Sequence, residues 1–384
     1  MRGSASRILT THAGSLPRPA ALVELQLRAS RGEKVDPALL GRAAADAVRS
    51  AVARQLELGI DVGNDGEQPR ESFVTYVRGR MSGFSGRSDR PPARDMAMFP
   101  EVRALVQPLG RTNLVAAPPR ATGAVKYVDQ AFLDLELSLL EKATRESGKT
   151  FAETFWTAPS PGIVAAAMQN DHYASLPGYL DAVAAALRVE YQAIARRGHV
   201  LQIDAPDLAM ERHRLFADRS LGDFLAFVDL AVAAINRALE GIPRDRVRLH
   251  VCWGNYEGPH HLDVPLEDLL PHLKPANVGA LVLSMANPRH AHEHKVVAKQ
   301  GLPNGWLLVA GVIDTTTNYV EHPEVVADRL ELAANAVGDP KRVLAGTDCG
   351  FDTSAGCGCV AEAVAWEKLK SLRAGAELAS RRLF

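Results

Sequence analysis

Cysteine is scarce in this chain, and long apolar runs are absent. Four cysteines occur in 384 residues, and none lies in the first 251. A secreted domain built on disulfides would carry more cysteines, spread more evenly, so a reducing, cytoplasmic compartment is expected instead. No apolar run approaches the roughly 18 residues that a membrane span needs. The segment Met1–Arg7 is too short and too polar to hold the apolar core of a signal peptide.

An excess of either charge is also missing. Lys and Arg (44) nearly balance Asp and Glu (45), which leaves a formal net charge of −1. This balance gives no basis for binding nucleic acid or an anionic membrane, so small molecules are the expected partners. The apolar share of 47% is enough for a large core. We therefore expect a soluble protein in which residues 1–384 form a single catalytic domain.

Short apolar, β-branched runs alternate with long amphipathic stretches along the chain. The eight runs are Arg7–Thr11, Ile60–Asn64, Thr154–Thr157, Val200–Asp204, Val247–Trp253, Ala280–Ser284, Trp306–Ile313 and Arg342–Thr347. The amphipathic stretches include Gly41–Leu58, Leu176–Arg197, Leu221–Leu239 and Pro323–Val337. Strand and helix repeated in this way predict an α/β protein with a parallel sheet, and eight repeats favour a closed (β/α)8 TIM barrel over an open sheet.

The segment at about residues 68–150 is too long for one repeat. It holds a basic, Pro-rich stretch at Arg87–Arg94 and a further apolar stretch at Ala121–Tyr127, which predicts an extra strand. We interpret the segment as an insertion after the second strand. It would then lie at the catalytic end of the barrel, where insertions can shape the substrate pocket.

Polar or metal-binding groups follow most of the predicted strands. Such groups occur in Thr10–Ser15, Asn64–Glu67, Gln202–Asp207, His250–Asn255, Asn287–His290, Asp314–Thr316 and Thr347–Gly350. In a barrel the carboxyl ends of all strands face one mouth. We therefore expect these groups to converge in space although they are far apart in sequence.

His250, Cys252 and Cys349 are the strongest candidates for binding a metal ion. Residues i and i+2 of a strand point to the same side, so His250 and Cys252 can reach one ion. Imidazole and thiolate suit Zn2+, and Cys349 at another strand end supplies a third ligand beside an open, catalytic position. The alternatives are a structural zinc in a barrel without chemistry, and cysteines that are only buried apolar residues. We favour the latter interpretation for Cys357 and Cys359.

A zinc ion with these three ligands could serve two kinds of reaction. One neutral imidazole and two thiolates leave the site near zero net charge. An incoming thiol could then lose its proton and bind as a third thiolate, available as a nucleophile. The open position could equally hold water for a hydrolysis. The sequence alone does not separate these two uses.

The other polar residues at the strand ends have weaker support. Glu67 and Asp204 directly follow core strands and could bind a substrate ammonium or hydroxyl group, or position a proton donor. Like Asp207, they could instead cap a turn or helix. Arg289 could pair with a substrate anion or with a structural carboxylate. Five histidines are interpreted as surface residues: His260 and His261 in a solvated loop, and His290, His292 and His294 at an exposed helix start.

Six short motifs at these strand ends follow one another in a recognisable order. They are Thr11–Pro19 (THAGSLPRP), Asp65–Gln68 (DGEQ), Leu201–Asp204 (LQID), His250–Asn255 (HVCWGN), Ala286–His290 (ANPRH) and Thr347–Phe351 (TDCGF). With them, the chain resembles the cobalamin-independent methionine synthase family, in particular its single-barrel "methionine synthase II" members. The similarity runs from Thr10 to Leu383.

This resemblance implies a (β/α)8 barrel with Zn2+ at its mouth, held by residues that correspond to His250, Cys252 and Cys349. In the family the zinc binds a thiol, homocysteine in true methionine synthases, as a thiolate that attacks an alkyl carbon. The resemblance also implies that the amino-acid part of homocysteine is held at Gly14, Ser15, Glu67 and Asp204.

The chain departs from the family pattern at three points. The family places a glutamate zinc ligand at the end of the sixth strand, where this chain has Ser284, a poor zinc ligand. The family carries a histidine proton donor after the seventh strand, where this chain reads Asp314-Thr315-Thr316. Complete methionine synthases are also roughly double this length, and their extra half helps to bind methylfolate, so methylfolate is not implied as the donor.

A second branch of the family is compatible with these departures. Epoxyalkane:coenzyme M transferases are single barrels that open an epoxide with a zinc-bound thiolate, and they need a cation for the sulfonate of coenzyme M. Arg289 or a basic residue of Arg87–Arg94 could supply it. Our first expectation is nevertheless a zinc-dependent transferase that methylates homocysteine or a similar small thiol with an alkyl donor. The epoxide or C–S lyase reaction is the alternative, and a homo-oligomer is compatible with either.

Overall fold

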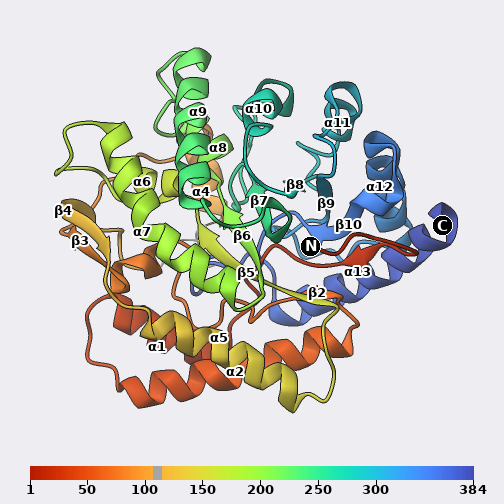
Figure 1. Ribbon diagram of the computed structural model, residues 1–384, viewed down its shortest axis with the longest axis horizontal. Coiled ribbons are helices and arrows are strands. Elements are labelled where there is room, and N and C mark those ends of the chain that lie inside the picture. The colour runs from red at the N-terminus through yellow and green to blue at the C-terminus, as the bar shows by residue number, and fades with distance from the viewer. Residues whose placement is uncertain (107–114) are drawn as a thin grey trace.

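A computed structural model of the chain, which describes residues 1–106 and 115–384, has eight parallel strands in one sheet (Figure 1). The predicted TIM barrel is confirmed, and each strand overlaps one of the eight predicted runs. The strands are β1 (Leu9–Thr10), β2 (Val62–Gly63), β5 (Glu153–Pro159), β6 (Val200–Asp204), β7 (Val247–Val251), β8 (Ala280–Ser284), β9 (Leu307–Ile313) and β10 (Val343–Thr347).

The order of the strands is β1-β10-β9-β8-β7-β6-β5-β2, which leaves β1 and β2 at the two edges of the sheet. These two short strands meet through a mixture of backbone and side-chain bonds. The N–H of Asp61 donates to the carbonyl of Thr10 (3.1 Å), and the Thr11 hydroxyl donates to the carbonyl of Val62 (2.8 Å). The Asp61 carboxylate also accepts the N–H of Thr10 (2.9 Å). The barrel therefore closes largely through one aspartate.

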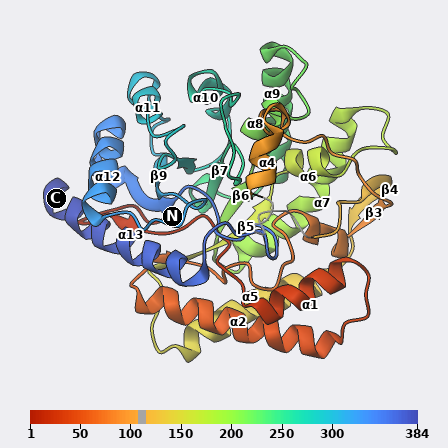
Figure 2. The same ribbon diagram turned by 180° about the vertical axis from the view of Figure 1, so that it is seen from behind.

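Helices form the outer layer (Figures 1 and 2). The helices expected from periodicity are α2, α7, α9 and α12, and each buries its apolar stripe against the sheet or a neighbouring helix. The α-helices are α1 (Ala20–Ser30), α2 (Pro37–Glu57), α3 (Arg94–Met98), α4 (Pro100–Val106), α5 (Ala131–Glu146), α6 (Pro161–Ala167), α7 (Leu176–Arg196), α8 (Asp207–Met210), α9 (Leu221–Ala238), α10 (Leu266–Leu273), α11 (His294–Gln300), α12 (Pro323–Val337) and α13 (Glu362–Leu383). Within the described residues, no helix is long and apolar enough to cross a membrane.

The chain between β2 and α5 forms an excursion from the barrel. It contains a 3-10 helix, η1 (Thr75–Gly79), and an antiparallel pair of strands, β3 (Met81–Ser85) and β4 (Arg120–Tyr127). The predicted extra strand at Ala121–Tyr127 is therefore present. The arginines of the basic stretch tie this excursion to the segment that follows β6. Arg90 pairs with Glu211, and Arg94 donates to the carbonyl of Ala217 (2.6 Å).

Two layers of side chains fill the inside of the barrel. The first is apolar and takes one residue from each of seven strands: Leu9, Val62, Phe155, Val200, Val282, Val309 and Leu344. The eighth strand, β7, contributes Arg248, whose guanidinium lies 3.7 Å from the ring centroid of Phe155. Arg248 donates to Gln202 (2.7 Å) and to the carbonyl of His12 (3.0 Å). A polar layer therefore separates the apolar core from the strand ends.

Candidate functional site

His250, Cys252 and Cys349 come together at the mouth of the barrel. His250 lies on β7, Cys252 follows that strand, and Cys349 follows β10. One imidazole nitrogen and the two sulfur atoms lie within 4.8 Å of one another, and all three side chains are buried. The residues expected to be ligands thus form one cluster, although about a hundred residues separate the strands that carry them.

The chemistry of this cluster fits a divalent cation. The hydrogen bond from the Cys349 thiol holds the pKa of Cys252 well below its ordinary value and raises the pKa of Cys349. Burial lowers the pKa of His250, but hydrogen bonds to Asp204 and Cys252 outweigh burial and raise it to about 10. Both shifts favour a proton on the His250 imidazole over one on the Cys252 thiol. A soft divalent cation would take the place of these protons, as expected for a zinc site.

Asp204 orients the imidazole of His250. Its Oδ1 lies 2.9 Å from His250 Nδ1 and also accepts a hydrogen bond from Gln202 (2.7 Å). With the Nδ1 proton directed at this carboxylate, Nε2 is the nitrogen left for a metal ion. In zinc sites, a carboxylate commonly accepts the N–H of the imidazole nitrogen that does not bind the metal. This hydrogen bond fixes the orientation of the ring and increases the basicity of the nitrogen that binds the metal.

Ser284, at the end of β8, does not supply a fourth ligand of the carboxylate kind. Its hydroxyl donates to the carbonyl of Asp348 (2.8 Å). The Asp348 carboxylate is occupied as well, because it accepts the backbone N–H groups of Met285 (2.8 Å), Ala286 (2.9 Å) and Asn287 (2.7 Å). In the part of the chain that the structure describes, the ligand cluster has three members.

A cavity of about 490 Å³, open to solvent, lies against the cluster. It is lined by Ala13, Ser15, Glu67, Phe73, Asp204, Pro206, Met210, His250, Cys252, Gly254, Asn255, Cys349, Gly350 and Thr353. The predicted binding residues Ser15, Glu67 and Asp204 thus line the same cavity as the three candidate metal ligands. Phe73, Met210 and Thr353 were not predicted, because they belong to connecting segments with no recognisable motif.

Glu67 approaches the cavity in a strained backbone conformation. Its φ of 56° lies in the left-handed region. Its carboxylate packs against Gly14, where a Cβ atom would lie 2.5 Å from Glu67 Oε1 and 2.8 Å from Thr157 Cγ2. Glycine at position 14 is therefore what admits the carboxylate, and its φ of 132° would itself be unfavourable for other residues.

The Glu67 carboxylate is buried and incompletely bonded. Its Oε2 has no hydrogen-bond partner among the described residues. Burial, followed by repulsion from Asp204, raises its pKa to about 7, although Arg70 and Arg18 act in the opposite direction. Two neighbouring carboxylates, one of them without a full set of donors, form a favourable place for a cationic group.

Of the two remaining predicted binding residues, Ser15 lines the cavity and Arg289 lies at the surface. Ser15 is buried on the cavity wall, and its carbonyl accepts the N–H of Phe351 (2.8 Å). Arg289 is exposed, donates to the carbonyl of His261 (3.4 Å) and is not among the residues that line the cavity. Its role in binding a substrate anion stays a prediction.

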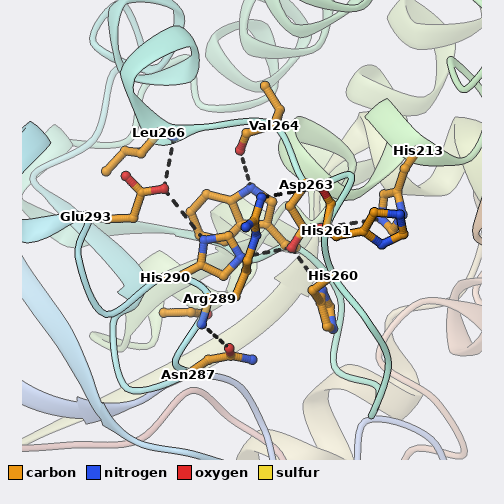
Figure 3. Close-up of polar contacts among 12 residues, drawn as sticks. His213, His260, His261, Asp263, Val264, Leu266, Asn287, Arg289, His290 and Glu293 are labelled. Carbon is orange, nitrogen blue, oxygen red and sulfur yellow. Dashed lines mark hydrogen bonds and ion pairs between the residues drawn. The ribbon is translucent and has the colours of Figure 1, made fainter. Parts of the chain in front are cut away.

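The surface interpretation of two histidines is wrong. His260 and His290 are 5% and 4% exposed, and both lie beside the buried carboxylate of Asp263 (Figure 3). The indole of Trp253 stacks on His290 at 3.8 Å between ring centroids. His261 and His292 are exposed, as expected.

The late cysteines take no part in the ligand cluster. Cys357 and Cys359 are half-buried, and none of the four cysteines, all within the described residues, forms a disulfide. Burial raises the pKa of the Cys357 thiol to about 12. Cys357 is therefore a protonated thiol, which fits the apolar role expected for it rather than metal binding.

Comparison with known proteins independently supports the resemblance to methionine synthases. No protein-family model matches the chain. It is 27% identical to a methionine synthase of Sulfolobus acidocaldarius over 343 residues, which cover 89% of this chain and 85% of the relative. It is 24% identical to a methionine synthase of Saccharolobus solfataricus over 372 residues, which cover 96% of this chain and 94% of the relative.

Solved structures show the same barrel. A B12-independent methionine synthase of Shewanella sp. W3-18-1 in complex with selenomethionine aligns with a TM-score of 0.75 and 24% identity, covering 98% of this chain and 99% of that one. A Listeria monocytogenes protein described as vitamin-B12 independent methionine synthase aligns with a TM-score of 0.64 and 17% identity, covering 97% and 98%. The ordered motifs, the curated relatives and the shared barrel together support the resemblance of the chain to the cobalamin-independent methionine synthase family.

Proposed function

We propose that the protein is a zinc-dependent methyltransferase that moves a methyl group onto the sulfur of homocysteine and so forms methionine. One observation carries the proposal. A buried group of one imidazole and two sulfurs borders a cavity whose wall holds two carboxylates, Glu67 and Asp204. The names of the curated relatives, and the selenomethionine bound by the Shewanella protein, support an amino acid with a sulfur-type side chain as the substrate.

Different residues of the cavity would bind the two ends of the substrate, its amino-acid group and its thiol. Glu67 and Asp204 supply negative charge for an α-ammonium group, which an amino-acid thiol carries at neutral pH. Ser15 lines the same cavity, and the segment that it forms with the neighbouring Gly14 is the candidate for holding the amino acid's carboxylate. The other end of the substrate would direct its sulfur toward His250, Cys252 and Cys349.

Zn2+ held by these three residues would supply the positive charge that keeps a substrate thiol deprotonated at neutral pH. Asp204 keeps the imidazole of His250 in a single orientation for this task. In the overall reaction an S–CH3 bond forms and the bond between the methyl group and its donor breaks. The leaving atom of the donor takes the electron pair of that bond and, in the balance, the proton lost by the thiol.

The charges around the cavity favour homocysteine over coenzyme M. A sulfonate needs a cationic partner, yet no Lys or Arg occurs among the described residues that line the cavity. Glu67 and Asp204 would instead repel a sulfonate. The chain also has nearly the length of the archaeal methionine synthases it matches.

The proposal is tested by comparing two thiols and two cysteine variants. Homocysteine added to the zinc-loaded protein should release about one proton per site, and coenzyme M should release none. Cys252→Ser should lower both zinc content and methionine formation, the latter by at least about 100-fold, because a metal ligand is lost. Cys357→Ser, outside the cluster, is the matched control and should retain both. Full methionine formation by metal-free protein, or proton release with coenzyme M alone, would overturn the proposal.

A further inference from the structure

A second group of buried histidines lies beside the thiolate cluster and has no role in the function proposed above. His260 and Asp263 belong to the connection between β7 and α10, and His290 lies in the connection between β8 and α11. His213 ends a short 3-10 helix, η3 (Glu211–His213), that follows β6. Three consecutive strand exits thus direct imidazoles toward one carboxylate, as Figure 3 shows.

The distances within this group are those of a metal-binding set. Oδ2 of Asp263 lies 2.9 Å from Nδ1 of His260 and 2.9 Å from Nε2 of His290. The three ligand atoms lie within 4.8 Å of one another, and each residue is at most 6% exposed. Two imidazoles and one carboxylate are the donors that zinc and other first-row divalent ions prefer.

Polar atoms without hydrogen bonds point to a missing partner at this place. His213 is 2% exposed, and its Nδ1 lies 3.4 Å from Oδ1 of Asp95. Its Nε2 has no hydrogen-bond partner within the described residues, and the same holds for Oδ1 of Asp263. His213 Nε2 and Asp263 Oδ1 are 3.7 Å apart, too far for a hydrogen bond. Two ligands that are each about 2.0–2.2 Å from one ion can have this separation. A cation between them would satisfy atoms whose burial without a partner is otherwise unfavourable.

The surroundings of the two imidazoles resemble the outer layer of a metal site. Nε2 of His260 lies 3.0 Å from the carbonyl of Tyr256, and Nδ1 of His290 lies 3.6 Å from Oε1 of Glu293. Each ring therefore presents one nitrogen to Asp263. The other nitrogen of His260 is hydrogen-bonded to the carbonyl of Tyr256, and that of His290 faces the carboxylate of Glu293 without a hydrogen bond. Histidines that bind metals are normally held in this way.

We propose that His260, Asp263 and His290 form a second divalent-metal site, with His213 as a fourth ligand, that takes a first-row transition ion such as Zn2+. It contains no sulfur and is distinct from the cysteine cluster. Both groups nevertheless border the same second cavity, of about 320 Å³, whose lining includes His260, His290, Cys252 and Cys349. A cation at this site would add positive charge to the cavity next to the sulfur ligands.

Cobalt substitution tests the second site without relying on activity. Co2+ bound to thiolates absorbs strongly in the near ultraviolet through sulfur-to-metal charge transfer, and Co2+ bound only to imidazole and carboxylate does not. The wild-type protein should bind about two Co2+ per chain. Cys252→Ser/Cys349→Ser should keep one ion and lose the ultraviolet band. His290→Gln should lose one ion and keep that band. His292→Gln, two residues away with a side chain 58% exposed, is the matched control and should keep both.

Anomalous scattering at the cobalt edge, from crystals of the wild-type protein, covers the case in which a variant does not fold. Two peaks, one at each group, support the proposal. A single peak at the cysteine cluster, or a wild-type stoichiometry of one that falls to zero in the double cysteine variant, overturns it. The histidine–carboxylate group would then be a network of ion pairs. Because the ultraviolet band and methionine formation report on the cysteine cluster, failure of the second site is distinguishable from failure of the proposed function.

Discussion

At the scale of single residues, two carboxylates of one cavity differ because their neighbours differ. Asp204 is hydrogen-bonded to His250 and Gln202. Glu67 has one oxygen without a partner among the described residues, and its pKa is raised to about 7. In the free protein Glu67 is therefore mostly protonated below pH 7 and mostly ionised above it. Only the ionised form can pair with an ammonium group.

This ionisation predicts how substrate binding depends on pH. As the pH falls from 8 to 6, kcat/KM for homocysteine should decrease by about tenfold, because the ionised fraction of Glu67 falls. Most of the change should appear in KM. Glu67→Gln should weaken binding at pH 8 and flatten the profile, whereas Glu57→Gln, an exposed control at the end of α2, should leave it unchanged. A profile of unchanged slope in Glu67→Gln would assign the ionisation to another group.

At the scale of elements, buried ion pairs attach the excursion after β2 to two barrel helices. Arg80, which follows η1, pairs with Glu136 of α5 (2.6 Å) and Glu190 of α7 (3.2 Å). Tyr76 and Tyr127 donate to the same Glu190 carboxylate at 2.5 and 2.9 Å. These bonds place the segment that carries Glu67 and Phe73 against the barrel. The buried ion pairs and hydrogen bonds therefore fix the position of a segment that lines the cavity.

Removing one charge of this network is expected to destabilise the protein strongly. Glu190→Gln leaves the buried Arg80 with a single carboxylate partner and should lower the free energy of unfolding by about 3–5 kcal/mol. Urea unfolding measures the change. Glu267→Gln breaks the exposed pair with Lys299 and should cost less than about 1 kcal/mol. Equal losses in the two variants would contradict the structural role given to Glu190.

At the scale of the whole molecule, closure of the barrel depends on the join between its first two strands. β1 and β2 are two residues long, so few backbone hydrogen bonds can form between them. The carboxylate of Asp61 compensates by accepting the N–H of Thr10 (2.9 Å) and two bonds from Arg7 (2.8 and 2.5 Å). One side chain thus substitutes for part of a strand ladder.

Asp61→Ala is therefore expected to open this join. It leaves the N–H of Thr10 without its acceptor, and the free energy of unfolding should fall by about 2–3 kcal/mol. Hydrogen exchange should accelerate first at the amides of β1 and β2, before the other strands are affected. The control is Asp46→Ala, an exposed residue of an i,i+3 pair with Arg49, which should change neither measurement. Uniform acceleration across all strands would argue against a local join.

Much of this architecture could be predicted from local patterns. The alternation of apolar runs and amphipathic stretches identified all eight barrel strands, because the periodicity of a strand or helix is written in consecutive residues. His250 and Cys252 were identified as partners for the same reason, since an i,i+2 spacing places both on one side of a strand. Adding Cys349 required only the rule that parallel strands end at one mouth.

The burial of His260 and His290 could not be predicted in this way. Both belong to connections whose sequences carry polar residues typical of surface loops. They are buried because Asp263 and Trp253 arrive from elsewhere and enclose them. Phe73 and Met210 line the cavity for a similar reason. Loop packing depends on which loops meet, and that is a property of the closed barrel.

The sequence by itself determined the strands, the long helices and the pairing of His250 with Cys252, since each follows from residues close together in the chain. The tertiary structure alone decided which loops enclose the mouth, the ionisation of Glu67 and the assembly of the second histidine group. Burial and electrostatic environment arise from contacts between distant segments, and these exist only after the barrel has closed.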